Sequence, residues 1–219
     1  MTPSVPISDF TLHAGTSQTP VWTQSIPFTL TATAVTDLWR KPGHIAHEIN
    51  SITTSMPLSS FARATATFRT EAFHTLYDQA GLVFLFPARG DGHPERWVKA
   101  GVEVVGRVPR VSVVAADKAS WADWSLAGGD EGVKKDTMTL EMVREGPSLV
   151  MNMVGKGGER STVREVTWVF EDDLVSEGPE ISVGVYVAKP TKDEGSPILE
   201  VCFEAMNVWK IGPDGEEIV

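Results

Sequence analysis

One segment of the chain alternates chemically capable side chains with small apolar ones. In residues 97–104, WVKAGVEV, one parity carries Trp97, Lys99 and Glu103, and the other carries only valine and alanine. A strand has a side-chain period of two, so the first set shares one face and the second faces the core. A carboxylate beside an ammonium group can transfer protons where burial shifts its pKa. We therefore take Glu103 and Lys99, with Tyr77 from the preceding segment, as candidate catalytic residues.

The competing interpretation is an ordinary solvated sheet face, on which Lys99 and Glu103 form a surface ion pair that adds little stability. The segment that begins at Tyr77 has the same alternation, with Tyr77 and Gln79 opposite its apolar positions. If the two segments pair as strands, both polar sets share one face, with Arg69 from an earlier segment beside them. Aromatic rings among mixed charges favour a binding surface without deciding between the interpretations.

The elements that must position these residues are short strands. Runs of β-branched and apolar residues recur along the chain between clusters of Gly, Pro and Asp, which predicts a single all-β domain over residues 1–219, a sandwich or barrel. Residues 1–20 are expected to be an N-terminal extension or edge segment, and residues 41–57 a loop with one short helical turn. The predicted strands are Phe28–Thr33, Ala62–Phe68, Gly81–Phe86, Trp97–Val105, Arg110–Val114, Thr137–Val143, Leu149–Met153, Thr162–Phe170, Ile181–Ala188 and Ile198–Val208.

Composition and charge limit the possible partners. The chain has 219 residues, 42% of them hydrophobic, and a formal net charge of -10 from 29 acidic and 19 basic residues. This charge disfavours nucleic acid and anionic membrane surfaces as partners, because both attract basic faces. The single cysteine, Cys202, allows no internal disulfide and is expected to be a buried, inert thiol. The first residues lack the basic and apolar regions of a signal peptide, so we expect a cytoplasmic protein. The oligomeric state is undetermined.

Several familiar kinds of site do not match the sequence. A glycosidase of a β-sandwich type places alternate carboxylates on one strand, but Cys202 stands between Glu200 and Glu204. His44 and His47 have the outline of a metal-ligand spacing without a third ligand, and a solvated loop explains them better. Residues 155–158, GKGG, lack the spacing of a phosphate-binding loop and predict a hairpin turn. We therefore expect no metal and no cofactor.

Four sequence blocks together carry a family resemblance. They are residues 36–40 (TDLWR), 77–82 (YDQAGL), 97–103 (WVKAGVE) and 123–125 (DWS), in this order. The set resembles the domain-of-unknown-function family that includes the yeast regulation-of-enolase protein and bacterial YesU-like proteins. The resemblance implies a concanavalin A-like jelly roll of two curved antiparallel sheets, with a concave face used for ligands. The resemblance is strong over residues 28–126 and rests on the strand pattern alone over the remainder, where the sequence after Leu126 departs from the family pattern.

The blocks also indicate which residues meet a ligand. The tryptophan rings of the blocks could stack on a sugar or another flat ligand, and the polar residues beside them could hydrogen-bond it. The resemblance thus implies a set of candidate ligand-binding residues, namely Trp39, Arg40, Gln79, Trp97 and Trp124. Four methionines, Met138, Met142, Met151 and Met153, could line an adaptable apolar pocket or pack in the core.

Two classes of function fit these observations. The first is an intracellular protein that binds a small organic molecule in a concave cleft and acts on it as a cofactor-independent cyclase, isomerase or lyase, through orientation and fixed polar groups. The alternative is a lectin-like module that binds a carbohydrate or sugar-like ligand without catalysis, or a regulatory protein-interaction domain. A deep pocket that contains Glu103 would favour catalysis, and an open groove with coplanar tryptophans would favour glycan binding.

Overall fold

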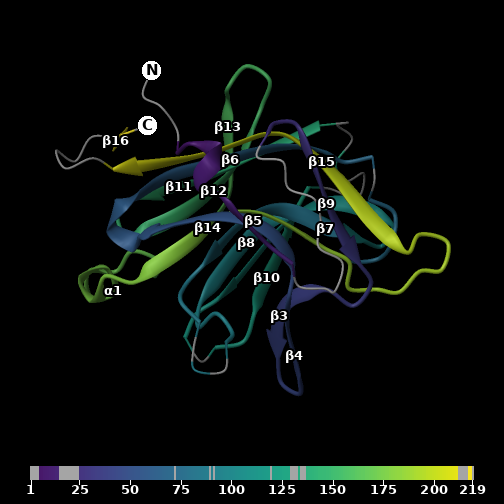
Figure 1. Cartoon of the computed structure of the whole chain (residues 1–219), viewed down its shortest axis with the longest axis horizontal. Helices are drawn as coiled ribbons and strands as arrows, with labels where there is room; N and C mark the ends of the chain where they lie inside the picture. Colours follow the sequence, from purple (N-terminus) through teal and green to yellow (C-terminus); the bar gives the residue numbers. More distant parts are fainter. Residues whose placement is uncertain are drawn as a thin grey trace.

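The computed structural model of the chain is a sandwich of two large antiparallel sheets (Figure 1). It describes residues 5–14, 25–71, 73–88, 90, 92–118, 120–128, 133, 137–211 and 217–218. The predicted all-β class and the jelly-roll sandwich of two antiparallel sheets are confirmed.

The first sheet has seven strands in the order β1-β5-β14-β7-β8-β9-β10. Their bounds are β1 Thr11–His13, β5 Asn50–Pro57, β14 Glu180–Ala188, β7 Gln79–Leu85, β8 Trp97–Val105, β9 Val108–Ala116 and β10 Asp123–Ala127. Strands β7 and β8 are antiparallel neighbours, as the alternation argument required. Cross-strand partners on this sheet therefore include Gln79 and Glu103, which share its outer face.

The second sheet runs β13-β12-β11-β6-β15-β16, and β2 pairs with β15 beside this path. The bounds are β13 Arg160–Val166, β12 Ser148–Val154, β11 Thr137–Glu145, β6 Phe61–Arg69, β15 Ile198–Ile211, β16 Glu217–Ile218 and β2 Phe28–Thr33. Strand β13 ends at Val166, because residues 167–170 form a turn where the sequence predicted a longer strand. The GKGG segment joins β12 to β13 as a hairpin turn, as predicted.

A hairpin of β3 (Asp37–Lys41) and β4 (His44–Glu48) forms a separate small sheet. One short α-helix, α1 (Asp172–Glu177), and two 3-10 turns, Ile7–Asp9 and Leu58–Ser60, complete the elements of the described residues. No helix in this part of the chain has the length and apolar character needed to cross a membrane.

The loop predicted over residues 41–57 is wrong, because β4 and β5 both lie within it. Strand β5, NSITTSMP, is rich in serine and threonine, yet it lies between β1 and β14 in the first sheet. There its residues 50–54 are buried, and its neighbours pair with it on both sides. Serine and threonine are tolerated in a strand that has a paired neighbour on each side. The composition of the segment alone does not show that such neighbours exist.

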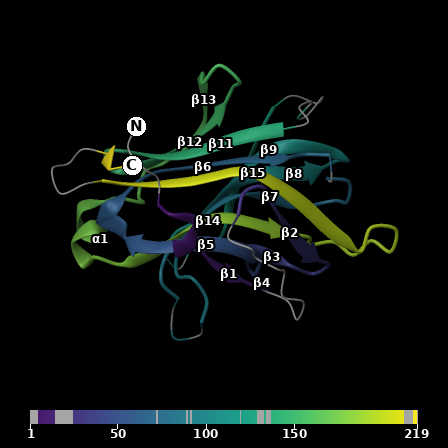
Figure 2. The same ribbon diagram turned by 45° about the horizontal axis from the view of Figure 1, so that its top comes forward.

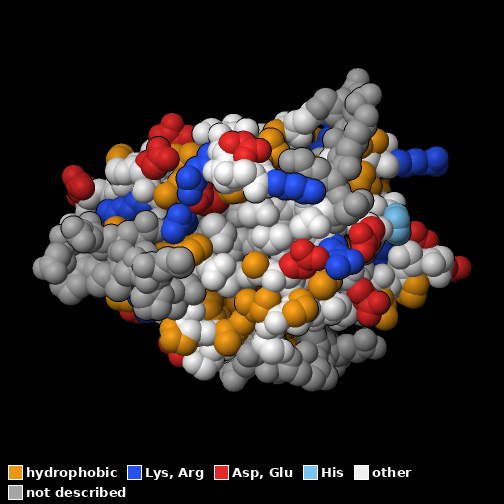
Figure 3. Space-filling model, turned by 90° about the horizontal axis from the view of Figure 1, so that it is seen from above, with side chains coloured by type: hydrophobic (Ala, Val, Ile, Leu, Met, Phe, Trp, Pro, Cys, Tyr) orange, Lys and Arg blue, Asp and Glu red, His pale blue; other side chains and the backbone are white. Residues whose placement is uncertain are grey.

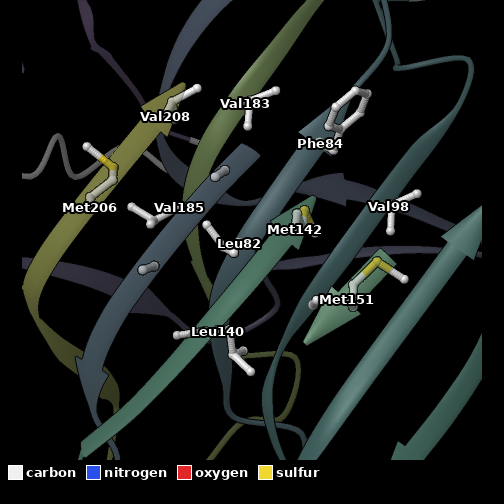
Figure 4. Packing of buried hydrophobic residues seen from close by; sticks show 14 of the residues in the cluster. Leu82, Phe84, Val98, Leu140, Met142, Met151, Val183, Val185, Met206 and Val208 are labelled. Atoms are coloured by element: carbon white, nitrogen blue, oxygen red, sulfur yellow. The ribbon is translucent and has the colours of Figure 1, made fainter. Parts of the chain in front are cut away.

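The two sheets pack face to face through an apolar core (Figure 4). This core brings together Leu82 and Val98 of the first sheet with Leu140, Met142 and Met151 of the second (Figure 4). The apolar parity of β7 and β8 lies in the core, as predicted. The methionines of β11 and β12 belong to this core or pack against it, so they do not line a ligand pocket.

The outer face of the second sheet, seen in Figure 3, carries acidic and basic side chains around a central area of other side chains and backbone. Arg69 lies on this sheet, where its Nε donates to Glu204 at 2.9 Å and its Nη1 to Glu71 at 3.4 Å. The expectation that Arg69 joins Lys99 and Glu103 is therefore wrong. Strand β6, which carries Arg69, belongs to the opposite sheet.

The outer face of the first sheet is covered in part by the β3–β4 hairpin, which lies below this sheet in Figures 1 and 2. Leu38 of β3 packs into a second, smaller apolar cluster with Val83, Trp97 and Val114 of the sheet. This cover turns a sheet face that would otherwise be solvated into a largely buried one.

Glycine is required at the centre of this covered face. Gly81 and Gly101 are cross-strand partners, and a Cβ on Gly101 would lie 2.1 Å from the carbonyl oxygen of Ala80 and 3.2 Å from the Tyr186 hydroxyl. We expect Gly101→Ala to lower the free energy of unfolding by about 1–3 kcal/mol, because the backbone must shift. Urea denaturation followed by tryptophan fluorescence measures this.

The matched control is Gly90→Ala, because a Cβ at Gly90 meets no atom within 4 Å. Its unfolding midpoint should stay close to that of the wild type. Equal midpoints for Gly101→Ala and Gly90→Ala would show that the close strand approach at Gly101 is not a constraint.

Candidate functional site

A cavity of about 310 Å³ opens on the outer face of the first sheet, beside the β3–β4 hairpin. Strands β7 and β8 supply its floor, the hairpin supplies one wall, and the segment after β14 supplies another. The described residues that line it are Asp37, Trp39, Lys41, His44, Tyr77, Gln79, Lys99, Glu103, Trp124, Pro190 and Thr191.

The floor of the cavity is a buried hydrogen-bonded group centred on Lys99. The Lys99 Nζ donates to Gln79 Oε1 at 2.5 Å and to Asp37 Oδ1 at 3.1 Å. The Gln79 Nε2 also donates to Asp37 Oδ1, at 3.3 Å, and the Tyr186 hydroxyl donates to Gln79 Oε1 at 3.4 Å. Lys99 is only 2% exposed and forms its ion pair with Asp37. The interpretation of Lys99 and Glu103 as a solvated surface pair is therefore wrong.

Glu103 lies on the same floor in a different environment. Its Oε2 accepts hydrogen bonds from the Ser112 hydroxyl at 2.7 Å and from Trp124 Nε1 at 3.1 Å. Burial raises the pKa of Glu103 above its ordinary value, and Asp37 raises it further, while Lys99, Ser112 and Trp124 act against this shift. The Glu103 Oε1 has no hydrogen-bond partner among the described residues. Because Oε2 already accepts from two donors, a proton on this carboxyl belongs on Oε1.

Three aromatic rings form the upper part of the cavity. Trp39 and Trp124 meet edge to face, with ring centroids 6.2 Å apart and planes at 89°, and Tyr77 and Trp124 meet at 6.5 Å and 74°. Tyr77 has a φ of 65°, in the left-handed region that side chains other than glycine seldom adopt. Its backbone N–H donates to the carbonyl of Val104 at 2.8 Å, which holds this turn on the end of β8.

A fully buried ion pair joins the two loops beside the cavity. The Lys189 Nζ lies 2.9 Å from Asp78 Oδ1, and their side chains are 0% and 1% exposed. The Asp78 Oδ2 also accepts from the backbone N–H of Thr75 at 2.9 Å. Asp78 follows Tyr77, and Lys189 precedes Pro190 and Thr191, so the pair positions cavity-lining residues on both loops.

Six of the predicted site residues line this cavity, namely Tyr77, Gln79, Lys99, Glu103, Trp39 and Trp124. The structure places the other two elsewhere. Trp97 shares the parity of Lys99 but is 0% exposed in the smaller apolar cluster under the hairpin. Arg40 lies on the opposite parity of β3 from Trp39, and its guanidinium donates to the carbonyls of Glu95 at 3.3 Å and Asp117 at 2.6 Å. Neither residue is among those that line the cavity.

The sequence interpretation missed several lining residues. Asp37 and Lys41 share the parity of Trp39, so recognising β3 as a strand would have found both. His44 was assigned to a solvated loop together with His47. Both lie on strand β4, where residues three apart point to opposite faces. His44 therefore lines the cavity, while His47 stacks on His93 with ring centroids 4.2 Å apart. No pattern in the sequence around Pro190 and Thr191 indicated that they line a cavity.

The comparisons with known proteins place the chain in a family. The family described as "Protein of unknown function (DUF1349)" matches residues 17–210. The chain belongs to this DUF1349 family. The match extends well beyond residue 126, where only the strand pattern was expected to resemble the family. A relative, an uncharacterised protein of Emericella nidulans, is 35% identical over 174 residues, which are 78% of this chain and 82% of that protein.

Solved structures share the fold of this DUF1349 protein. A functionally unknown protein from Saccharomyces cerevisiae superposes with a TM-score of 0.71 at 20% identity, over 93% of this chain and 97% of that one. The GH43 protein BlXynB from Bacillus licheniformis has a TM-score of 0.61 at 12% identity, over 83% of this chain but 32% of that one. An alginate lyase from Klebsiella pneumoniae has a TM-score of 0.53 at 10% identity, over 86% and 82%. At such low identities these superpositions show a common fold and nothing further about this chain.

The raised pKa of Glu103 predicts a pH-dependent stability. The folded protein binds this proton more tightly than the unfolded chain, whose carboxyl has a pKa near 4.5. The free energy of unfolding therefore falls as pH rises from 4.5 to the raised pKa and stays lower above it. Glu103→Gln removes this effect, so its stability relative to the wild type should increase across the same window. Urea denaturation between about pH 4 and pH 8 measures the difference.

Glu200→Gln makes the same charge change at an exposed position of β15 and serves as the control. A stability difference between Glu103→Gln and the wild type that is constant with pH would contradict the shift.

Breaking the ion pair of Asp78 and Lys189 should strongly destabilise the protein. Asp78→Asn leaves the Lys189 ammonium buried without a countercharge, which costs about 3–5 kcal/mol of unfolding free energy. The double variant Asp78→Leu/Lys189→Met should recover much of this loss, because two apolar side chains replace both charges. Chemical denaturation of the single and double variants tests this.

Lys118→Met provides a control, because Lys118 pairs with Glu95 at 3.1 Å while its side chain is 60% exposed. Loss of such an exposed ion pair should change the free energy of unfolding by less than about 1 kcal/mol. Similar losses of unfolding free energy in Asp78→Asn and Lys118→Met would contradict a special role of the buried ion pair.

Proposed function

We propose that this DUF1349 protein binds a small organic molecule in the cavity and acts on it by general acid–base catalysis, as an isomerase, cyclase or lyase. The observation that carries the proposal is the arrangement of the Glu103 carboxyl. Its Oε2 is held by Ser112 and Trp124, and its Oε1 is left without a partner among the described residues. A buried acid with one oriented oxygen is suited to proton transfer.

The proposed chemistry follows from this arrangement. The protonated Oε1 donates its proton to a carbonyl or hydroxyl oxygen of the bound molecule. The carboxylate that forms keeps two hydrogen bonds on Oε2, and the nearby charge of Lys99 stabilises it more than the charge of Asp37 destabilises it. Glu103 then regains a proton from a carbon or hydroxyl of the same molecule, so the proton count balances over the cycle. Tyr77 lines the cavity and can hydrogen-bond the ligand from its rim.

The ring geometry supports a compact ligand over an extended glycan. Rings that line a groove and stack on successive sugars need similar orientations, whereas here Trp124 is at 89° to Trp39 and at 74° to Tyr77. Rings that meet edge to face instead form an apolar corner against which a compact ligand can pack. A lectin-like module and the regulatory role suggested by the regulation-of-enolase likeness are therefore less well supported than small-molecule catalysis.

The test is conversion of small molecules by the purified protein. We would incubate it with a metabolite extract of its source cells and follow changes in chromatographic retention and mass. A conversion that depends on the protein is expected, and Glu103→Gln should slow it by about 10²–10⁴-fold, the range for loss of a general acid.

Glu200→Gln is the matched control and should convert at the wild-type rate. Retention of a ligand without any conversion would support a binding module in place of an enzyme. Full turnover by Glu103→Gln would remove Glu103 from the chemistry.

A further inference from the structure

The charges around the cavity are arranged by depth. At the floor and wall, both lining carboxyl groups of the described residues are engaged: Asp37 with Lys99, and Glu103 through its Oε2. The ion pair of Lys99 and Asp37 adds no net charge to the cavity. When Glu103 is protonated, as the proposed function requires, the floor is neutral and polar.

The rim of the cavity carries groups of a different kind. Lys41 and His44 are cross-strand partners at the turn of the β3–β4 hairpin, and both are exposed. Thr191, which is half-buried, lines the cavity from the segment after β14. Within the described part of the chain, none of these three side chains makes a hydrogen bond or ion pair. The rim therefore offers an ammonium group, an imidazole and a hydroxyl without protein partners.

This rim contrasts with the protein as a whole. The chain has a net charge of -10, yet the described residues that line the rim include a cation and no carboxylate. A local positive site on an acidic protein attracts an anionic group to that point and repels a cation. Hydrogen bonds between charged partners are also stronger than those between neutral ones, which favours an anionic oxygen at Lys41.

We propose that the ligand is a small monoanion: an apolar body that carries a carboxylate, or an equivalent anionic oxygen group, at one end. The anion lies at the rim among Lys41, His44 and Thr191. The apolar body packs against the aromatic lining of the cavity, which Trp39, Tyr77 and Trp124 form. The opposite end, with its reacting oxygen, then reaches Glu103 at the floor. This inference rests on the proposed function, because it assumes that the cavity is the ligand site.

The experiment compares two probes of similar shape, of which one is anionic and the other is uncharged. The probes are 2-naphthoate, an apolar monoanion, and 2-naphthamide, its uncharged analogue of the same shape. Binding is measured by titration calorimetry and by quenching of tryptophan fluorescence. The wild type should bind the naphthoate about fivefold more tightly, the size expected for one partly solvated charge-assisted contact. Lys41→Gln should remove this preference, and high salt should weaken it.

Lys156→Gln makes the same charge change in the exposed turn between β12 and β13 and should keep the preference. Equal affinity for both probes, a preference for the amide, or a preference that survives Lys41→Gln would overturn the monoanion inference and leave the proposed site standing. If neither probe binds, or if Trp39→Ala and Trp124→Ala leave the binding of both unchanged, the cavity is not the site, and the proposed function fails as well.

Discussion

The buried charge of Lys99 is the constraint on which the candidate site depends. An ammonium group in the middle of a covered sheet face is costly unless an opposite charge and hydrogen bonds satisfy it. Asp37 provides that charge, and it belongs to the β3–β4 hairpin rather than to the sheet. Its Oδ1 also accepts from the backbone N–H of Leu38 at 2.7 Å. The pair therefore holds the hairpin on the outer face of the first sheet, and the cavity forms where the hairpin and the sheet diverge.

A second buried ammonium group, that of Lys189, is likewise neutralised by a carboxylate beside the cavity. Asp78 and Lys189 exclude water from each other completely, and together they join the turn that carries Tyr77 to the segment that carries Thr191. Glu103 differs from these groups because no cation lies close enough to form an ion pair with it in the described residues. Burial thus acts on Glu103 without full compensation, and its pKa rises. Two satisfied ion pairs thus surround one buried carboxyl that has no ion-pair partner among the described residues.

The alternation of polar and apolar side chains in β7 and β8 could be predicted from the sequence, because it is a local property of each strand. Side chains two apart share a face whatever the rest of the fold does, so Gln79, Lys99 and Glu103 were correctly grouped. Predictions that needed knowledge of neighbouring strands were less successful. Arg69 was placed on the wrong sheet, and β5 was taken for a loop because its serines and threonines gave no apolar pattern. Both errors concern which strands lie side by side, which depends on contacts distant in sequence.

The sequence by itself determined the all-β class, the parity of the central strands and most of the residues that line the cavity. Only the tertiary structure decided which polar residues line the cavity. Trp97 and Lys99 share one parity, but the hairpin covers Trp97 with Leu38 and leaves Lys99 at the cavity floor. Lys41, His44 and Thr191 come together from segments about 150 residues apart. The physical reason is that periodicity assigns a side chain to a face, whereas burial and charge pairing depend on what packs over that face.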